Sequence, residues 1–189
     1  MMNKIIAQTA YSVFGGKPKV TKFWDDLHIS SIEILSCADR PEQGTTSYST
    51  IGLFAHETDF TTSVGTTIRV ELVGVSASFY SYFPNILATC AFNIINSNFT
   101  CYPGAIFRDV VSMYDQNSEM KHIIFVPPFM WEESLKTIHT EQFEIAWLLG
   151  VPISSAEYEF ATQNSPDELE SLFEDAQIDI FDLRRSSVL

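Results

Sequence analysis

Hydrophobic positions along the chain follow two different periods, which predicts a mixture of helices and strands. Near the N-terminus, apolar side chains recur at helical spacing as far as Phe14, and Gly15-Gly16 follows them directly. Glycine just after the last apolar position is a common helix stop. We therefore expect a surface helix over residues 3–14.

Other segments alternate with a period of two, as strands do. The clearest case is residues 67–73, where Arg69 and Glu71 alternate with aliphatic residues. We expect those two charged side chains to share the polar face of a strand, opposite the core. Similar patterns and short apolar runs closed by proline or turn residues predict further strands over residues 31–35, 47–53, 122–126 and 143–151.

Helical periodicity returns over residues 79–96, a stretch with no charged side chain. Near the C-terminus, Ser154 and Glu157 have the spacing of a capping box, and Ser165 and Glu168 repeat that spacing. Strands first, one helix among them and helices last favour an α+β layered fold over a doubly wound sheet.

Composition fits one domain with a substantial core. The chain has 189 residues, of which 46% are hydrophobic and 13% aromatic. It carries a formal net charge of −13, and residues 132–189 hold 13 acids against 3 bases. Affinity for a phosphate backbone comes from lysine and arginine, so nucleic acid is excluded as a partner. An acidic segment of this kind instead attracts basic proteins.

The acidic C-terminal third permits two interpretations. Acids in the first turn of a helix are stabilised by its dipole, which explains Asp167 and Glu168. Glu174 and Asp175 lie at a helix end, where the dipole disfavours them. The acids either form a solvated face that keeps the protein soluble or an electrostatic landing site for a basic partner.

Catalytic chemistry is poorly supported. Cys37, Cys90 and Cys101 have small or apolar neighbours, so we expect buried, unreactive thiols in a reducing compartment. The four histidines lie far apart, and no loop has a nucleotide-binding glycine pattern. No leader or membrane-spanning pattern is found. We expect a cytoplasmic protein without enzymatic activity, metal or cofactor.

The C-terminal half resembles the suppressor-of-fused (SUFU) domain. The resemblance lies in residues 147–154 (WLLGVPIS), 157–159 (EYE) and 178–188 (IDIFDLRRSSV). Residues 123–128 (IIFVPP) and Trp131 suit it as well. The N-terminal half fits less specifically, so the resemblance spans most of the chain.

The resemblance implies a single SUFU-like domain over residues 1–189, with a mixed, largely antiparallel central sheet, flanking helices and an acidic helical segment at 154–189. The eukaryotic regulator of that name has additional regions and binds a transcription-factor peptide. Short bacterial members, which this chain resembles more, are regarded as immunity proteins or antitoxins of polymorphic toxin systems such as those of LXG toxins. The family implies neither catalysis nor a cofactor.

These arguments together predict an antitoxin that binds a cognate protein toxin, in particular a nuclease, and covers its basic active-site surface. The residues expected to bind the partner are Glu157, Glu159, Asp167, Glu168, Glu170, Glu174 and Asp175. A structural role is expected for Asp182, Arg185 and Ser186, the first two as a pair that braces the final turn. One alternative is a peptide-binding scaffold that uses an exposed sheet edge and the uncharged span 72–107. A hydrolase built on Cys37 or Cys101 with a histidine is the third hypothesis.

Overall fold

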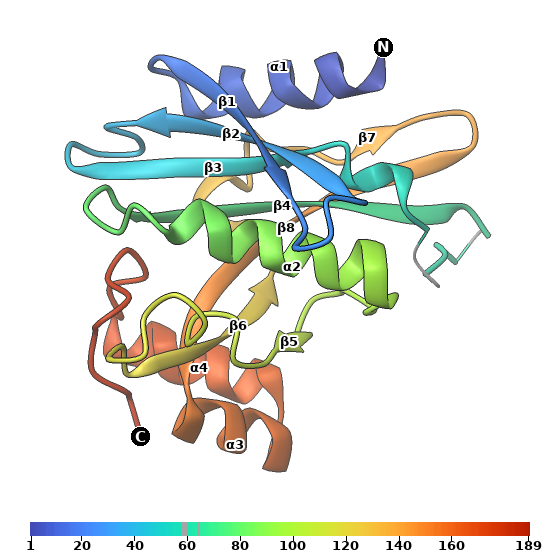
Figure 1. The fold of residues 1–189 in the computed structure, drawn as a ribbon. Helices are drawn as coiled ribbons and strands as arrows, with labels where there is room; N and C mark the ends of the chain where they lie inside the picture. The colour runs from blue at the N-terminus through green and yellow to red at the C-terminus, as the bar shows by residue number, and fades with distance from the viewer. Residues whose placement is uncertain (58–59, 64) are drawn as a thin grey trace.

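A computed structural model describes residues 1–57, 60–63 and 65–189. Across these residues the chain forms one eight-stranded sheet with helices on both faces (Figure 1). The strands are β1 (Pro18–Trp24), β2 (Ser31–Ala38), β3 (Thr45–Ile51), β4 (Thr67–Ala77), β5 (Ile106–Phe107), β6 (Met120–Val126), β7 (Ile138–His139) and β8 (Phe143–Ser154). The helices are α1 (Met2–Phe14), α2 (Phe83–Ser97), α3 (Ser155–Gln163) and α4 (Pro166–Ala176), with short 3₁₀ turns at Leu53–Ala55 and Phe129–Trp131.

The sheet is mixed and largely antiparallel, which confirms the expected fold class. Its strand order is β1-β2-β3-β4-β8-β6-β5, and β7 pairs with β8 beside this path. The first four strands pair antiparallel in chain order, whereas β4 and β8 run parallel, from Thr67 opposite Phe143 to Val73 opposite Leu149. The long strands β4 and β8 therefore form the centre of the sheet.

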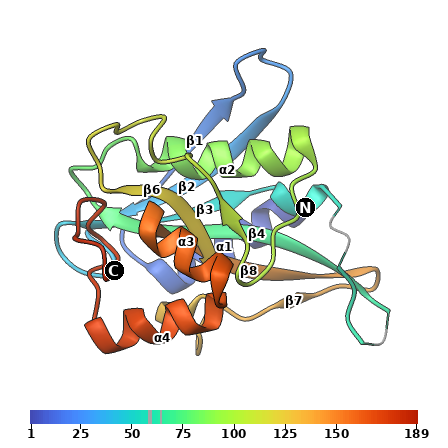
Figure 2. The same cartoon turned by 90° about the horizontal axis from the view of Figure 1, so that it is seen from below.

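Two apolar cores lie on opposite faces of this sheet. Alternate residues of β4 face in opposite directions: Leu72 packs with α2, whereas Val73 packs in the core that includes side chains of α1, α3 and α4. At Gly74 the backbone approaches α2 so closely that a Cβ atom would lie 2.6 Å from Cε1 of Phe83. Seen from below, α3 and α4 lie beside β6 and the C-terminus (Figure 2).

Most predicted elements are present, with one correction in β4. The helix at the N-terminus, the strands and the two serine caps appear as expected, and Ser154 and Glu157 make a complete capping box. The prediction that Glu71 lies on a polar face is wrong, because β4 is covered on both faces and Glu71 is fully buried. Its carboxylate accepts hydrogen bonds from the Thr50 hydroxyl and from the N–H groups of Gly52 and Phe54.

Residues 177–189, here called the C-terminal tail, run back across the domain without regular structure. The N–H of Ala77 donates to the carbonyl of Phe181 at 2.9 Å. The Ser118 hydroxyl donates to the carbonyl of Leu183, whose side chain is fully buried. The tail is thus fastened at several points, and its first residues form one wall of the site described next.

A candidate protein-binding groove beside the acidic helix

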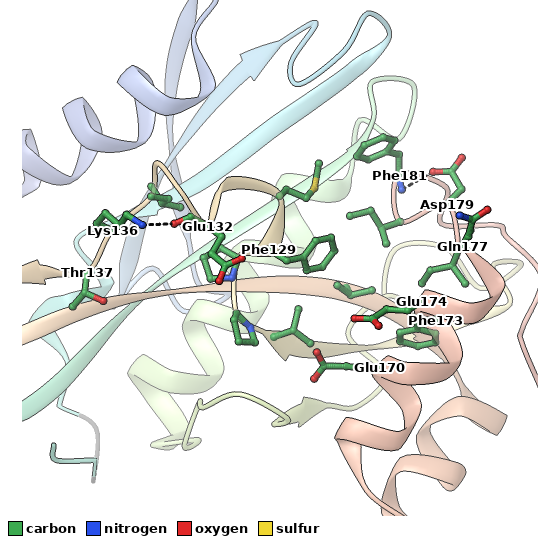
Figure 3. Close-up of a pocket in the computed structure, with 18 residues that line it drawn as sticks. Phe129, Glu132, Lys136, Thr137, Glu170, Phe173, Glu174, Gln177, Asp179 and Phe181 are labelled. Atoms are coloured by element: carbon green, nitrogen blue, oxygen red, sulfur yellow. Dashed lines mark hydrogen bonds between the residues drawn. The ribbon is translucent and has the colours of Figure 1, made fainter. Parts of the chain in front are cut away.

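A groove of about 760 Å³ lies between α4, the start of the C-terminal tail and residues 127–137, here called the β6–β7 loop. Figure 3 shows Glu170 and Glu174 of α4 on one side and Phe129 and Glu132 of the loop on the other. A cavity of this size matches the volumes of pockets that enclose small ligands or several side chains of a partner.

Local sequence explains how the β6–β7 loop presents an aromatic ring. Pro127 and Pro128 end β6, and a 3₁₀ turn follows over Phe129–Trp131. Trp131 turns inward and packs on Phe14, with ring centroids 4.7 Å apart. Phe129, two residues earlier, is left 54% exposed at the groove.

The orientation of α4 follows from its cap and its apolar face. The Ser165 hydroxyl accepts a hydrogen bond from the N–H of Glu168, and Pro166 opens the helix. Leu169 and Phe173 are buried in the core. Residues one position further along the helix, Glu170 and Glu174, consequently line the groove.

The third wall is formed by the tail as it leaves α4. Gln177 adopts a left-handed conformation with a φ of 49°, which ends the helix. The N–H of Ile178 returns to the carbonyl of Phe173 at 3.3 Å. Ile178 and Phe181 then pack partly buried against the core while still lining the groove. The groove therefore has an apolar floor.

The rim of the groove is acidic. Glu132, Glu170, Glu174 and Asp179 line it, and among the lining residues that the structure describes Lys136 is the one basic side chain. Burial raises the pKa of Glu170, and the negative charges of Asp167 and Glu174 raise it further. No ion pair joins Glu170 or Glu174 to a base within residues 1–57, 60–63 and 65–189.

The predicted partner-binding acids fall into three groups. Glu170 and Glu174 line the groove. A second group lies exposed on α3 and α4 outside its lining: Glu159, Asp167, Glu168 and Asp175. Glu157 is the exception and requires a correction. It is fully buried and binds Arg185, so it has no surface to offer a partner.

Two of the residues predicted to be structural, Asp182 and Arg185, contact other parts of the chain, but not each other's side chains. The Tyr80 hydroxyl donates to Asp182, and Arg185 donates to Glu157. Ser186 is exposed, and its carbonyl accepts from Nη1 of Arg185 at 3.0 Å.

None of the three cysteines exposes its thiol in the folded chain. Cys37, Cys90 and Cys101 are free and buried. Burial raises the pKa of all three thiols, which suppresses the nucleophilic thiolate. Among the same residues no group of three metal-ligating side chains is found, and no helix is long and apolar enough to cross a bilayer.

Comparison with known proteins places the chain in a family. The model of the suppressor of fused protein family matches residues 29–186. The chain is a member of the suppressor of fused family. It is 52% identical over 187 residues to the immunity protein YqcF of Bacillus subtilis (strain 168), covering 99% of this chain and 97% of that protein.

Solved structures of suppressor of fused proteins share the fold at low sequence identity. A homologue from Neisseria gonorrhoeae FA 1090 superposes with a TM-score of 0.74 at 17% identity, covering 100% of this chain and 97% of the homologue. Drosophila Suppressor of Fused gives a TM-score of 0.66 at 14% identity, covering 97% of this chain and 50% of the fly protein. The fold is therefore shared with bacterial and animal relatives.

Groove residues outside α4 were not identified from the sequence. Phe129 lies in no motif. The tail residues Ile178 and Phe181 belong to the segment 178–188 that resembles the family, but that resemblance assigns them no contact role, and the three residues meet only in the folded chain. The one local signal for Phe129 was its position directly after Pro127-Pro128. Two prolines end a strand, so the side chain that follows them lies outside it.

Proposed function

We propose that this chain is an immunity protein that binds a cognate protein toxin and neutralises it without chemical turnover. The observation that carries the proposal is the 52% identity, over nearly the whole length of both chains, to the immunity protein YqcF. The proposed site of action is the cytoplasm, where an incoming or self-made toxin has to be stopped.

The charge distribution supports a basic partner. Residues 132–189 have 13 acids and 3 bases, and α3 and α4 expose Glu159, Asp167, Glu168 and Asp175. A nuclease binds the phosphates of its substrate with lysine and arginine, so its active-site surface is basic. Complementary charge accelerates association and suppresses wrong partners. We propose that the acidic surface of α3 and α4 covers such an active site and excludes nucleic acid.

The alternative of a scaffold that adds a peptide strand to a sheet edge has less support. The long edge strand is β1, whose outer edge pairs with no other strand in the described part of the sheet. Lys19 and Lys22 are exposed on this strand. Exposed lysines on an edge strand are a common device against added strands.

Co-expression with the adjacent toxin tests the proposal. The C-terminal domain of a toxin encoded beside this gene is expressed in a sensitive strain with and without this chain, and growth is followed. We expect rescue, co-purification of the two proteins and loss of nuclease activity in the purified complex. Equal cell death with and without this chain would contradict the proposal, as would turnover of a small molecule by the pure protein.

A further inference from the structure

We propose that the groove receives one amphipathic segment of the toxin, with an apolar anchor on the groove floor and lysine or arginine side chains on both sides of that anchor. This inference rests on the proposed function and deepens it, because it names the part of the acidic surface that recognises the partner and the chemistry of the segment recognised.

The floor supplies the place for the anchor. Phe129 is 54% exposed, and Ile178, Ile180 and Phe181 are only partly covered by the core beneath them. Exposed aromatic and aliphatic side chains gathered in a concave site are typical of protein interfaces, where a few buried anchors provide most of the binding energy. An apolar side chain of a partner would complete their burial.

The rim supplies the charge complementarity. Asp167, Glu170 and Glu174 follow one another at spacings of three and four residues, so they are neighbours on one side of α4. Their mutual repulsion contributes to the raised pKa of Glu170, after the larger effect of burial. Glu174 also lies in the last turn of the helix, where the dipole is unfavourable for an acid and where α4 carries no basic residue. A cation bound at the rim would relieve both effects.

The loop side completes the acidic rim. Glu132 lines the groove opposite α4, and Asp179 lines it from the tail (Figure 3). Lys136 does not neutralise them: its ammonium donates to the backbone carbonyl of Glu132 at 3.0 Å and lies 4.0 Å from the carboxylate of Glu133. Negative charge therefore surrounds the apolar floor, which fits a segment with basic residues before and after its anchor.

A second hollow, of about 330 Å³ beside α2, lacks this complementarity. Its lining is mostly uncharged, with Asn85 and Asn93 among its polar residues. Its Asp25 is already engaged, by the N–H of Ile29 at 2.8 Å and by the amide of Asn96 at 3.1 Å. The other acid of its lining, Asp26, is exposed, but four acids line the groove, so we assign the basic segment to the groove.

Peptide binding tests the groove directly. The probe is a fluorescein-labelled 12-residue peptide with a central tryptophan flanked by alternating lysine and leucine, and a glutamate-for-lysine analogue serves as the negative probe. Fluorescence anisotropy is measured with the full chain, with Phe129→Ala, and with the double variant Glu170→Lys/Glu174→Lys. We expect each variant to bind the basic peptide at least tenfold more weakly than the unmodified chain.

Matched controls separate the groove from general charge and hydrophobicity. Phe79→Ala removes a ring that is 73% exposed and lies outside the groove lining. Glu42→Lys/Glu119→Lys changes the net charge as much as the groove variant does, at exposed positions outside that lining and outside α3 and α4. We expect both controls to stay within threefold of the unmodified chain. If the lysine variant fails to fold, the variant Glu170→Gln/Glu174→Gln replaces it in the binding measurement. Its melting temperature should equal that of the unmodified chain. Equal weakening in groove and control variants would overturn the inference.

The same variants in the growth assay distinguish the inference from the proposed function. If the unmodified chain rescues growth and only the groove variants lose rescue, both are supported. If all variants rescue equally, the groove is not the recognition site although the immunity function stands. If the unmodified chain fails to rescue growth, the proposed function is wrong, and the groove does not bind a segment of that toxin. The peptide measurement still decides whether the groove binds a basic amphipathic segment.

Discussion

Arg185 in the C-terminal tail and Glu157 in the first turn of α3 form a buried, two-pronged ion pair. Nη1 of Arg185 lies 2.7 Å from Oε1 of Glu157, and Nη2 lies 2.8 Å from Oε2. The carboxylate also accepts from the N–H groups of Ser154 and Val188, and Nη2 donates to the carbonyl of Pro152. Both carboxylate oxygens and both Nη atoms of the pair thus have hydrogen-bond partners inside the protein, as buried charges require.

Breaking this pair from one side should be costly. Glu157→Ala leaves the Arg185 guanidinium buried without its counter-ion, so we expect the free energy of unfolding to fall by about 3–5 kcal/mol. The measurement is urea denaturation followed by tryptophan fluorescence. Glu159→Ala, an exposed neighbour on the same helix, should change stability by less than about 0.5 kcal/mol. Similar losses in the two variants would show that the pair is not needed to hold the tail.

Glu71 should make stability fall as pH rises from 4.5 to about 7. Burial raises the pKa of its carboxyl from 4.5 to about 7, against the opposing effect of hydrogen bonds from Thr50, Phe54 and Gly52. Between these two pH values the folded protein keeps a proton that the unfolded chain releases. Stability from this group is therefore complete below pH 4.5 and is lost up to pH 7, by about 3 kcal/mol.

Glu71→Gln isolates this contribution. The glutamine oxygen can still accept from the N–H groups of Gly52 and Phe54, but the side chain no longer titrates. Denaturant midpoints of both proteins are compared at pH 5 and pH 8. We expect the glutamine variant to lose less stability between them. Identical slopes would mean that Glu71 does not hold a proton in the folded state.

Gly74 is required by the close contact between β4 and α2. In Gly74→Ala the new Cβ would lie 2.6 Å from Cε1 of Phe83, so either the buried Phe83 ring or the helix that carries it must shift. We expect a loss of about 1–3 kcal/mol, measured as a shift in the denaturation midpoint. Adding Phe83→Leu removes the clashing ring carbons, so the double variant should be more stable than the sum of the single losses predicts. Strict additivity would argue against the contact.

The three thiols should be inert in the folded protein. Cys37, Cys90 and Cys101 have exposed fractions of 0–1%, and burial raises the pKa of each thiol. We expect 5,5′-dithiobis(2-nitrobenzoic acid) to label none of them within minutes under native conditions and all three in guanidinium chloride. Rapid native labelling would show that the core opens more readily than this packing allows.

Local patterns allowed most of the fold to be predicted. The helix at residues 2–14 and the caps at Ser154 and Ser165 depend on neighbouring residues, so they could be recognised in the sequence. Strand β1 (Pro18–Trp24) was missed because its side chains are mostly exposed and show no apolar pattern. It is a strand because it pairs antiparallel with β2 along its whole length. Glu71 was misplaced because the period of two gives the face of a side chain and does not show whether that face is covered.

The site was only partly predictable for the same reason. The acids of α4 could be recognised in the sequence as a cluster of charge. The role of Glu157 as a buried counter-ion could not, because its partner Arg185 lies 28 positions further along the chain. The groove itself needs the β6–β7 loop and the tail to meet at α4. Such contacts between distant segments leave no local pattern in a single sequence.

Ring contacts with buried side chains support two walls of the groove. One wall is held because Trp131 packs on Phe14, and the other because the Arg185 guanidinium lies over the Phe173 ring, 5.1 Å from its centroid. A docking segment would therefore meet a surface already in its final shape and would lose mainly its own conformational freedom. Such preorganisation would suit the proposed immunity function, because less of the binding energy is spent on ordering the site.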